Sequence, residues 1–180
     1  AGQVEQWFWL VRSRISPMML GLETWDATSW HHLAARQVWV ARELGAALHL
    51  QYGLHSLACV TAFMGDLAAA EEFASEAQLI ADVTSTPRLP YSEMVVAALR
   101  GNALEATRAI AAILHEAESW QMNVHVTFAN WARALLDNAL GRHDDARRAG
   151  LLAFEGIGVA FGRLVVPELA EAASRTGDRA

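Results

Sequence analysis

Apolar residues recur at intervals of three and four along most of the chain, and no segment of useful length alternates between apolar and polar positions. Intervals of three and four are typical of amphipathic helices, whereas alternation would indicate half-buried strands. Glycine and proline residues divide the pattern into about nine predicted helices. These segments are 3–15, 26–44, 46–64, 66–83, 90–100, 102–120, 124–140, 142–155 and 164–176.

Most breaks between the predicted helices are short, from one to six residues, and the two longest, after 3–15 and 142–155, are ten and eight residues. Such connections force neighbouring helices to lie antiparallel, so the pattern predicts helical hairpins stacked side by side. Asp26 and Asp66 are predicted to cap the helices that follow them, because their carboxylates can accept hydrogen bonds from free amides of the first turn. Gly45 is predicted to end the segment 26–44.

Four glycines mark an internal repeat: Gly65, Gly101, Gly141 and Gly177 are spaced by 36, 40 and 36 residues. Small or apolar residues recur at fixed distances from them. They are Ala70, Ala106 and Ala146 five residues after; Ala77, Ile113 and Ala153 twelve after; and Ala58, Met94, Ala134 and Ala170 seven before. Small side chains on both sides of a glycine turn let the two helices of a hairpin approach closely.

This pattern resembles degenerate tetratricopeptide (TPR) repeats, although Leu67, Ala103 and His143 replace the usual aromatic residue after the glycine. The resemblance implies an all-α fold, a right-handed α-α superhelix of stacked antiparallel hairpins, in which residues 1–180 form a single repeat domain. The last repeat has its first helix but no partner helix after Gly177. We therefore expect the chain to be a fragment of a longer protein.

Several stretches are similar to the helical repeat region of LuxR-type (MalT-like) signal-transduction ATPases, transcriptional regulators common in actinobacteria. The most specific stretch runs from Trp25-Asp26 through Ser29-Trp30 to Arg36-Gln37-Val38. The full set is Trp7–Leu10, Thr24–Trp30, Leu33–Val38, Ala41–Ala47, Gly65–Glu71, Leu89–Tyr91, Ala139–Ala146 and Pro167–Ala173.

In that family an ATPase module precedes the helical array and a helix-turn-helix domain follows it, and the array senses inducers or partner proteins. The chain has no lysine and hence no G-x-x-x-x-G-K-[ST] loop. The resemblance therefore implies the regulatory middle of a transcription factor, whose partners are its own ATPase and DNA-binding modules, another protein or a small-molecule effector.

Composition and charge limit which partners and which cellular location we expect for the chain. The 14 basic residues are outnumbered by 20 acidic ones, for a net charge of −6, which argues against direct contact with nucleic acid. A single cysteine, Cys59, favours a reducing, cytoplasmic location, and no basic segment precedes the apolar run Trp7–Leu10 as in a signal peptide. Residues 45–65 lack formal charge, but His49, Gln51 and His55 within them favour a buried helix over a membrane span.

No catalytic, metal or cofactor site is predicted. His31 and His32 point about 100° apart on a helix, and His49 and His55 lack the i, i+4 spacing of paired metal ligands. Arg142, Arg147 and Arg148 form the densest basic cluster, but Asp144 and Asp145 interleave with it. An all-α enzyme with an aromatic cavity is the third and weakest hypothesis.

The repeat phase predicts a concave face lined by aromatic and polar side chains, suited to an extended peptide or a small effector. Its candidate binding residues are Tyr52, His55, Tyr91, Phe128, Trp131, Asn138, Glu168 and Glu171. The first hypothesis is a sensory protein-interaction domain of a LuxR-family regulator, and the alternative is a freestanding TPR-like adaptor that binds a peptide. Coverage of this face by neighbouring helices is an equally good interpretation of the same residues.

An apolar strip after helix 164–176 predicts self-association.

Overall fold

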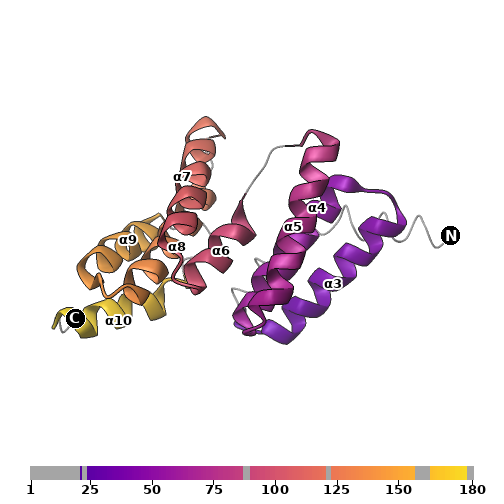
Figure 1. The fold of residues 1–180 in the computed structure, drawn as a ribbon. Helices are drawn as coiled ribbons and strands as arrows, with labels where there is room; N and C mark the ends of the chain where they lie inside the picture. Colours follow the sequence, from indigo (N-terminus) through magenta and orange to yellow (C-terminus); the bar gives the residue numbers. More distant parts are fainter. Residues whose placement is uncertain (1–20, 22–23, 87–89, 121–122, 157–162, 178–180) are drawn as a thin grey trace. The chain divides into compact units, whose positions relative to one another are not determined.

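The protein is described by a computed structural model for residues 21, 24–86, 90–120, 123–156 and 163–177 (Figure 1). Within these ranges every regular element is an α-helix, which confirms the all-α prediction. The predicted helix 3–15 lies outside the described residues. The helices, labelled as in Figure 1, are α3 (Ala27–Glu43), α4 (Ala47–Phe63), α5 (Leu67–Thr84), α6 (Tyr91–Leu99), α7 (Ala103–Trp120), α8 (Asn123–Ala139), α9 (His143–Glu155) and α10 (Val166–Thr176).

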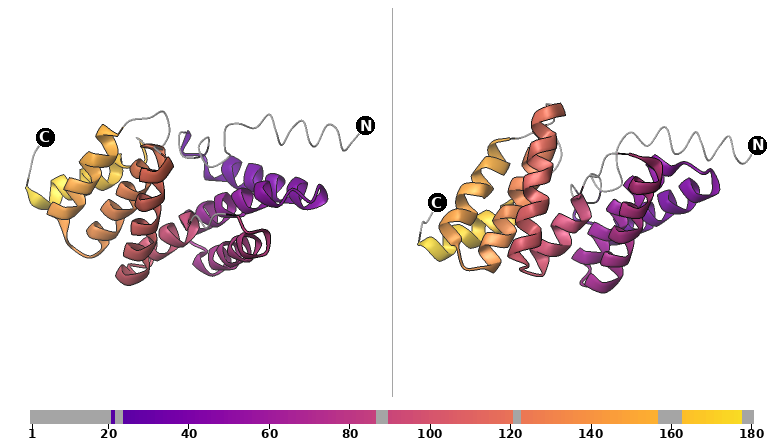
Figure 2. Two further views of the ribbon diagram at one scale, coloured as in Figure 1. Left: turned by 90° about the horizontal axis from the view of Figure 1, so that it is seen from above. Right: turned by 45° about the horizontal axis from the view of Figure 1, so that its top comes forward.

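The chain divides into two compact units, Ala1–Arg88 and Leu89–Ala180. In the N-terminal unit, α3 and α5 both pack against α4 (indigo to magenta in Figure 2). In the C-terminal unit, α8 packs against α6, α7, α9 and α10, so α8 is the central helix of that unit. The predictions of one domain over residues 1–180 and of a right-handed superhelix stay predictions.

Three of the four repeat glycines, Gly65, Gly101 and Gly141, share one turn geometry. Gly65 has φ +94°, and the amide of Asp66 beyond it donates to the Thr61 carbonyl at 3.1 Å. Gly65 itself donates to Ala62 at 3.0 Å, which completes a Schellman motif. The same pair of bonds closes the helices that end at Gly45, Gly101 and Gly141, whereas Gly177, also of positive φ, donates a single bond to the Ala173 carbonyl.

The helix starts follow the predicted caps. Asp26 accepts a hydrogen bond from the Ser29 amide at 3.0 Å, and Asp66 accepts one from the Ala69 amide at 3.0 Å. These bonds satisfy amides that the first turn of a helix leaves free. The helix bounds lie within about two residues of the predicted ones, as expected when caps and glycine turns define them.

The residues in register with the glycines form the hairpin contacts. Nine of the ten side chains singled out by the repeat are fully buried at 0% exposure: Ala58, Ala70, Ala77, Met94, Ala106, Ile113, Ala134, Ala146 and Ala153. The tenth, Ala170 on α10, is exposed. No helix follows α10 within the part of the chain that the structure describes.

Candidate functional site

An aromatic cluster occupies the middle of the C-terminal unit. The Phe128 and Trp131 rings, both on α8, are stacked with centroids 5.3 Å apart and an interplanar angle of 9°. The Tyr91 ring of α6 lies 6.0 Å from Phe128. All three side chains are buried, with exposures of 8% for Tyr91, 2% for Phe128 and 1% for Trp131. These three predicted residues therefore lie together, and their side chains are part of the core.

His125 belongs to the same cluster, although it was not among the predicted site residues. The Tyr91 hydroxyl and His125 Nδ1 share a short hydrogen bond. Burial lowers the pKa of His125, which favours the neutral imidazole, and an unprotonated Nδ1 can accept a hydrogen bond from the Tyr91 hydroxyl. His125 lies three residues before Phe128 on α8, and this helical spacing was the signal in the sequence that could have identified it.

Helix α10 closes the cluster on another side. Trp131 Nε1 donates to Glu168 Oε1 at 3.3 Å, and Asn138 Nδ2 donates to the Glu168 backbone carbonyl at 2.9 Å. Burial raises the pKa of the Glu168 carboxyl, while the hydrogen bond from Trp131 acts in the opposite direction. Glu168 and Asn138 therefore join α10 to α8.

The remaining predicted site residues lie apart from this cluster. Glu171 is on the exposed side of α10, 3.9 Å from Arg175. Tyr52 and His55 are on α4 of the N-terminal unit, where Tyr52 is 45% exposed and His55 is 4% exposed. Burial lowers the pKa of His55 to about 4, so this imidazole is neutral at pH 7. Whether any predicted residue binds a ligand stays a prediction.

An open apolar groove lies on the N-terminal unit, a feature that the sequence analysis missed. It has a volume of about 380 Å³ and lies between the C-terminal ends of α3 and α5, over the start of α4. Apolar side chains make up most of its wall, and an ion pair between Arg42 and Glu76, 2.7 Å long, lies at its edge. We call it the α3–α5 groove. Its lining residues are Ala41, Arg42, Gly45, Ala47, Leu50, Glu76, Leu79, Ile80, Val83 and Thr84.

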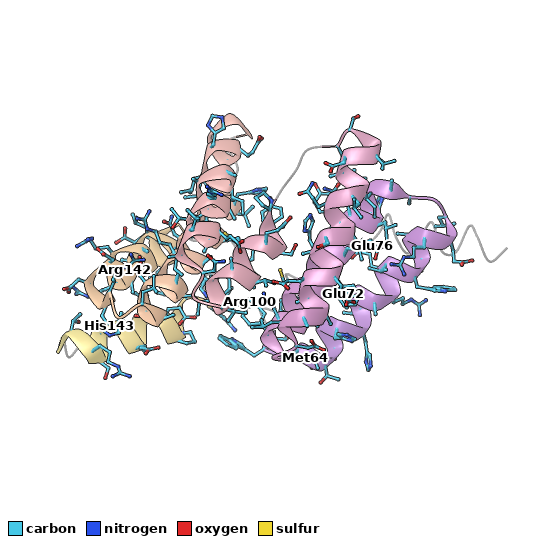
Figure 3. The ribbon with its side chains drawn as sticks, viewed as in Figure 1. Met64, Glu72, Glu76, Arg100, Arg142 and His143 are labelled. Carbon is cyan, nitrogen blue, oxygen red and sulfur yellow. The ribbon has the colours of Figure 1, made fainter. Side chains whose placement is uncertain are left out.

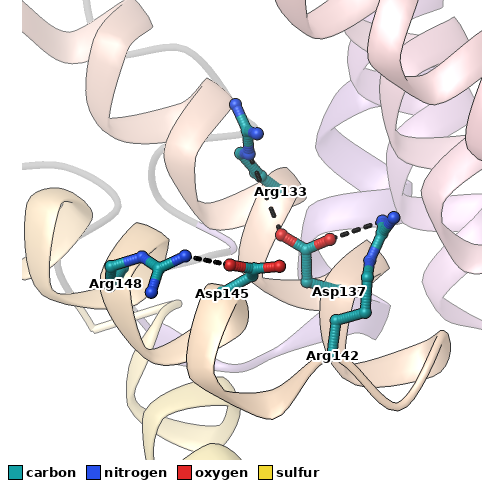
Figure 4. Close-up of polar contacts among 5 residues, drawn as sticks. All are labelled: Arg133, Asp137, Arg142, Asp145 and Arg148. Carbon is teal, nitrogen blue, oxygen red and sulfur yellow. Dashed lines mark hydrogen bonds and ion pairs between the residues drawn. The ribbon is translucent and has the colours of Figure 1, made fainter.

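A smaller polar cavity of about 290 Å³ lies where α7, α8 and α9 meet. The buried carboxylate of Asp137 lies 2.6 Å from Arg142 and 3.8 Å from Arg133 (Figure 4). Asp145 pairs with Arg148 on α9, whereas Arg142 of the same basic cluster pairs with Asp137 of α8, which the sequence analysis did not name. Because Arg142 also donates its backbone amide to the Asp137 carbonyl at 2.8 Å, the ion pair strengthens the α8–α9 turn.

The described residues contain no group of three or more histidine, cysteine, aspartate or glutamate side chains arranged to hold a metal ion. Among the same residues, no helix is long and apolar enough to span a bilayer. No protein-family model, curated protein or solved structure matches the chain.

Proposed function

We propose that the chain is a regulatory protein-interaction domain built from TPR-like helical hairpins, and that it comes from a LuxR-type ATPase regulator. The observation that supports an interaction role is the open α3–α5 groove, where Leu79 and Val83 are 64% and 84% exposed. Contiguous exposed apolar surface of this kind marks interaction sites in proteins of this size. The LuxR assignment rests on the sequence resemblance alone.

The aromatic cluster provides a way for binding to change the structure. Trp131 and Asn138 hold Glu168 of α10. An effector or partner that replaced these two contacts would favour an arrangement with α10 displaced, and a displaced helix is a signal that neighbouring modules can read. The effector site of this proposal comprises Tyr91, Phe128, Trp131, Asn138 and Glu168.

The first test of the regulator assignment is the reading frame that encodes the chain. A frame that runs from an upstream Walker A module into a downstream helix-turn-helix domain supports the regulator. Those two modules, purified separately, are then expected to bind the chain in isothermal titration calorimetry. A frame without either module contradicts the regulator and leaves the alternative, an adaptor whose open groove takes a peptide of another protein.

The effector part of the proposal is tested with Trp131→Phe. Trp131→Ala is unsuitable because removing a buried, stacked tryptophan costs about 3–5 kcal/mol and endangers the fold. Phenylalanine keeps an aromatic ring beside Phe128 but removes the donor to Glu168. A metabolite that raises the melting temperature of the wild type and not of this variant supports the site, since ligands that bind only the folded state stabilise it. An equal shift in both proteins would place the binding elsewhere.

A further inference from the structure

The α3–α5 groove is an open trough between two helices. Its floor is the first turn of α4, with Ala47 and Leu50, and its sides are the last turns of α3 and α5. Leu79, Ile80 and Val83 run along the α5 side with spacings of one and three residues. Parallel ridges of apolar side chains from two helices leave a trough that the apolar face of a third helix can fill.

The N-terminal unit that carries the groove is strongly acidic. Residues 24–86 contain seven carboxylates and two arginines, a net charge of −5, which is nearly all of the −6 carried by the whole chain. Arg42 is already engaged by both carboxylate oxygens of Glu76 at 2.7 Å. Helix α5 contains Glu71, Glu72, Glu76 and Asp82 and no basic residue. Glu72 and Glu76 follow one another along α5 in Figure 3.

We propose that the α3–α5 groove binds a basic amphipathic helix of a partner protein. This inference rests on the proposed interaction function and names the class of partner. The apolar stripe of such a helix would cover Leu79 and Val83, and its arginine or lysine flanks would face the acidic side chains of α5. Charge complementarity of this kind steers association and selects among partners that have similar apolar stripes. The same charge disfavours a second copy of this unit as the occupant, because its acidic surface would be repelled.

The test uses the full 180-residue chain and two labelled peptides of about 18 residues, or five helical turns. Both peptides carry leucines at intervals of three and four. One has arginines on its flanks and the other has glutamates. Fluorescence anisotropy is expected to give the arginine peptide an affinity at least about tenfold higher at low salt, and this advantage shrinks as salt screens the charges. Equal affinities would overturn the proposal, and so would a failure of both peptides to bind.

The site is tested by substitution within the groove. Val83→Asp puts a charge on the apolar wall and is expected to weaken the arginine peptide about tenfold or more, because a buried, unpaired charge is costly. Since Val83 is 84% exposed, the fold tolerates the change. Leu104→Asp is the control: this leucine of α7 is also largely exposed, at 62% against 84% for Val83, and it lies outside the groove. Equal loss in both variants, or loss in neither, would overturn the site.

Glu72→Lys tests the charge term separately. It leaves the apolar lining intact, so the arginine peptide is expected to weaken and the glutamate peptide to gain affinity. Light scattering on the unliganded chain tests whether a second copy of the chain occupies the groove instead. Self-association that Val83→Asp abolishes would overturn the proposal of a basic helical partner. If the regulator's modules bind the chain and Val83→Asp leaves that binding unchanged, this inference fails while the proposed function stands.

Discussion

Two ionisable side chains, the buried His55 and the half-buried Glu168, have pKa values shifted by burial in opposite directions. His55 is kept neutral inside the N-terminal unit, and Glu168 is held beside Trp131 in the C-terminal unit. For both residues, the largest cause of the pKa shift is burial, which removes the charged form from water. Each makes the stability of its unit depend on pH, with a sign set by the direction of its pKa change.

For His55, acid is expected to destabilise the N-terminal unit. The folded pKa of about 4 lies below the ordinary 6.5, so the full contribution is present above pH 6.5 and is lost as pH falls toward 4. The loss is on the order of 3 kcal/mol. Urea unfolding at pH 7 and pH 4.5 measures it. His55→Gln is expected to flatten the dependence, whereas His32→Gln, at an exposed position of α3, leaves it unchanged. A flat profile in the wild type would mean that His55 reaches water.

For Glu168 the sign is reversed. Its folded pKa is raised, so its contribution is full below the ordinary pKa of a glutamate and is lost as pH rises through the raised value. Glu168→Gln mimics the protonated carboxyl and still accepts from Trp131. We expect this variant to be more stable than the wild type at pH 7 and equal to it in acid, as measured by thermal unfolding at both pH values. Greater stability of the wild type at pH 7 would show that the charged carboxylate is the favoured partner of Trp131.

At the scale of elements, the helices were predictable because their signals are local. Asp66 caps α5, and Gly65 with its positive φ ends the helix before it. Both features depend only on residues within a few positions of the turn. The burial of Trp131 was not predictable in the same way, since it depends on α10, which lies 37 residues further along the chain at Glu168. The α3–α5 groove was missed for a related reason. Leu79 and Val83 fit the pattern of a core-facing stripe, and only the packing of α3 and α4 decides that they stay uncovered.

The glycine turns permit a test of backbone geometry without changes in packing. Gly101 has φ +67°, and a Cβ added to it would meet nothing within 4 Å. Gly101→Ala is therefore expected to cost about 1–2 kcal/mol, the penalty of a left-handed conformation for a residue with a side chain. Gly101→Asn should cost less because asparagine tolerates this conformation better. Urea unfolding of the three proteins gives the comparison. Equal stability of wild type and Gly101→Ala would show that the turn relaxes to another geometry.

At the scale of the whole molecule, the repeat allows the burial of equivalent positions in different hairpins to be compared. Seven residues before its glycine, each of the first three repeats has a side chain with 0% exposure: Ala58, Met94 and Ala134. Ala170 has the same place in the fourth repeat and is exposed on α10. Ala134 and Ala170 are thus the same residue at equivalent positions of two repeats, but one is buried and the other is exposed.

This difference predicts unequal effects of one substitution. Ala134→Leu adds a larger side chain to a closed hairpin contact and is expected to destabilise the C-terminal unit by about 1–3 kcal/mol through overpacking. Ala170→Leu adds the same atoms to an exposed face and is expected to change stability by less than about 0.5 kcal/mol. Leucine and alanine both favour helix, so propensity does not separate the two variants. Urea unfolding followed by circular dichroism measures both. A cost for Ala170→Leu equal to that for Ala134→Leu would show that α10 is covered at Ala170 in solution, by a second copy of the chain or by another segment.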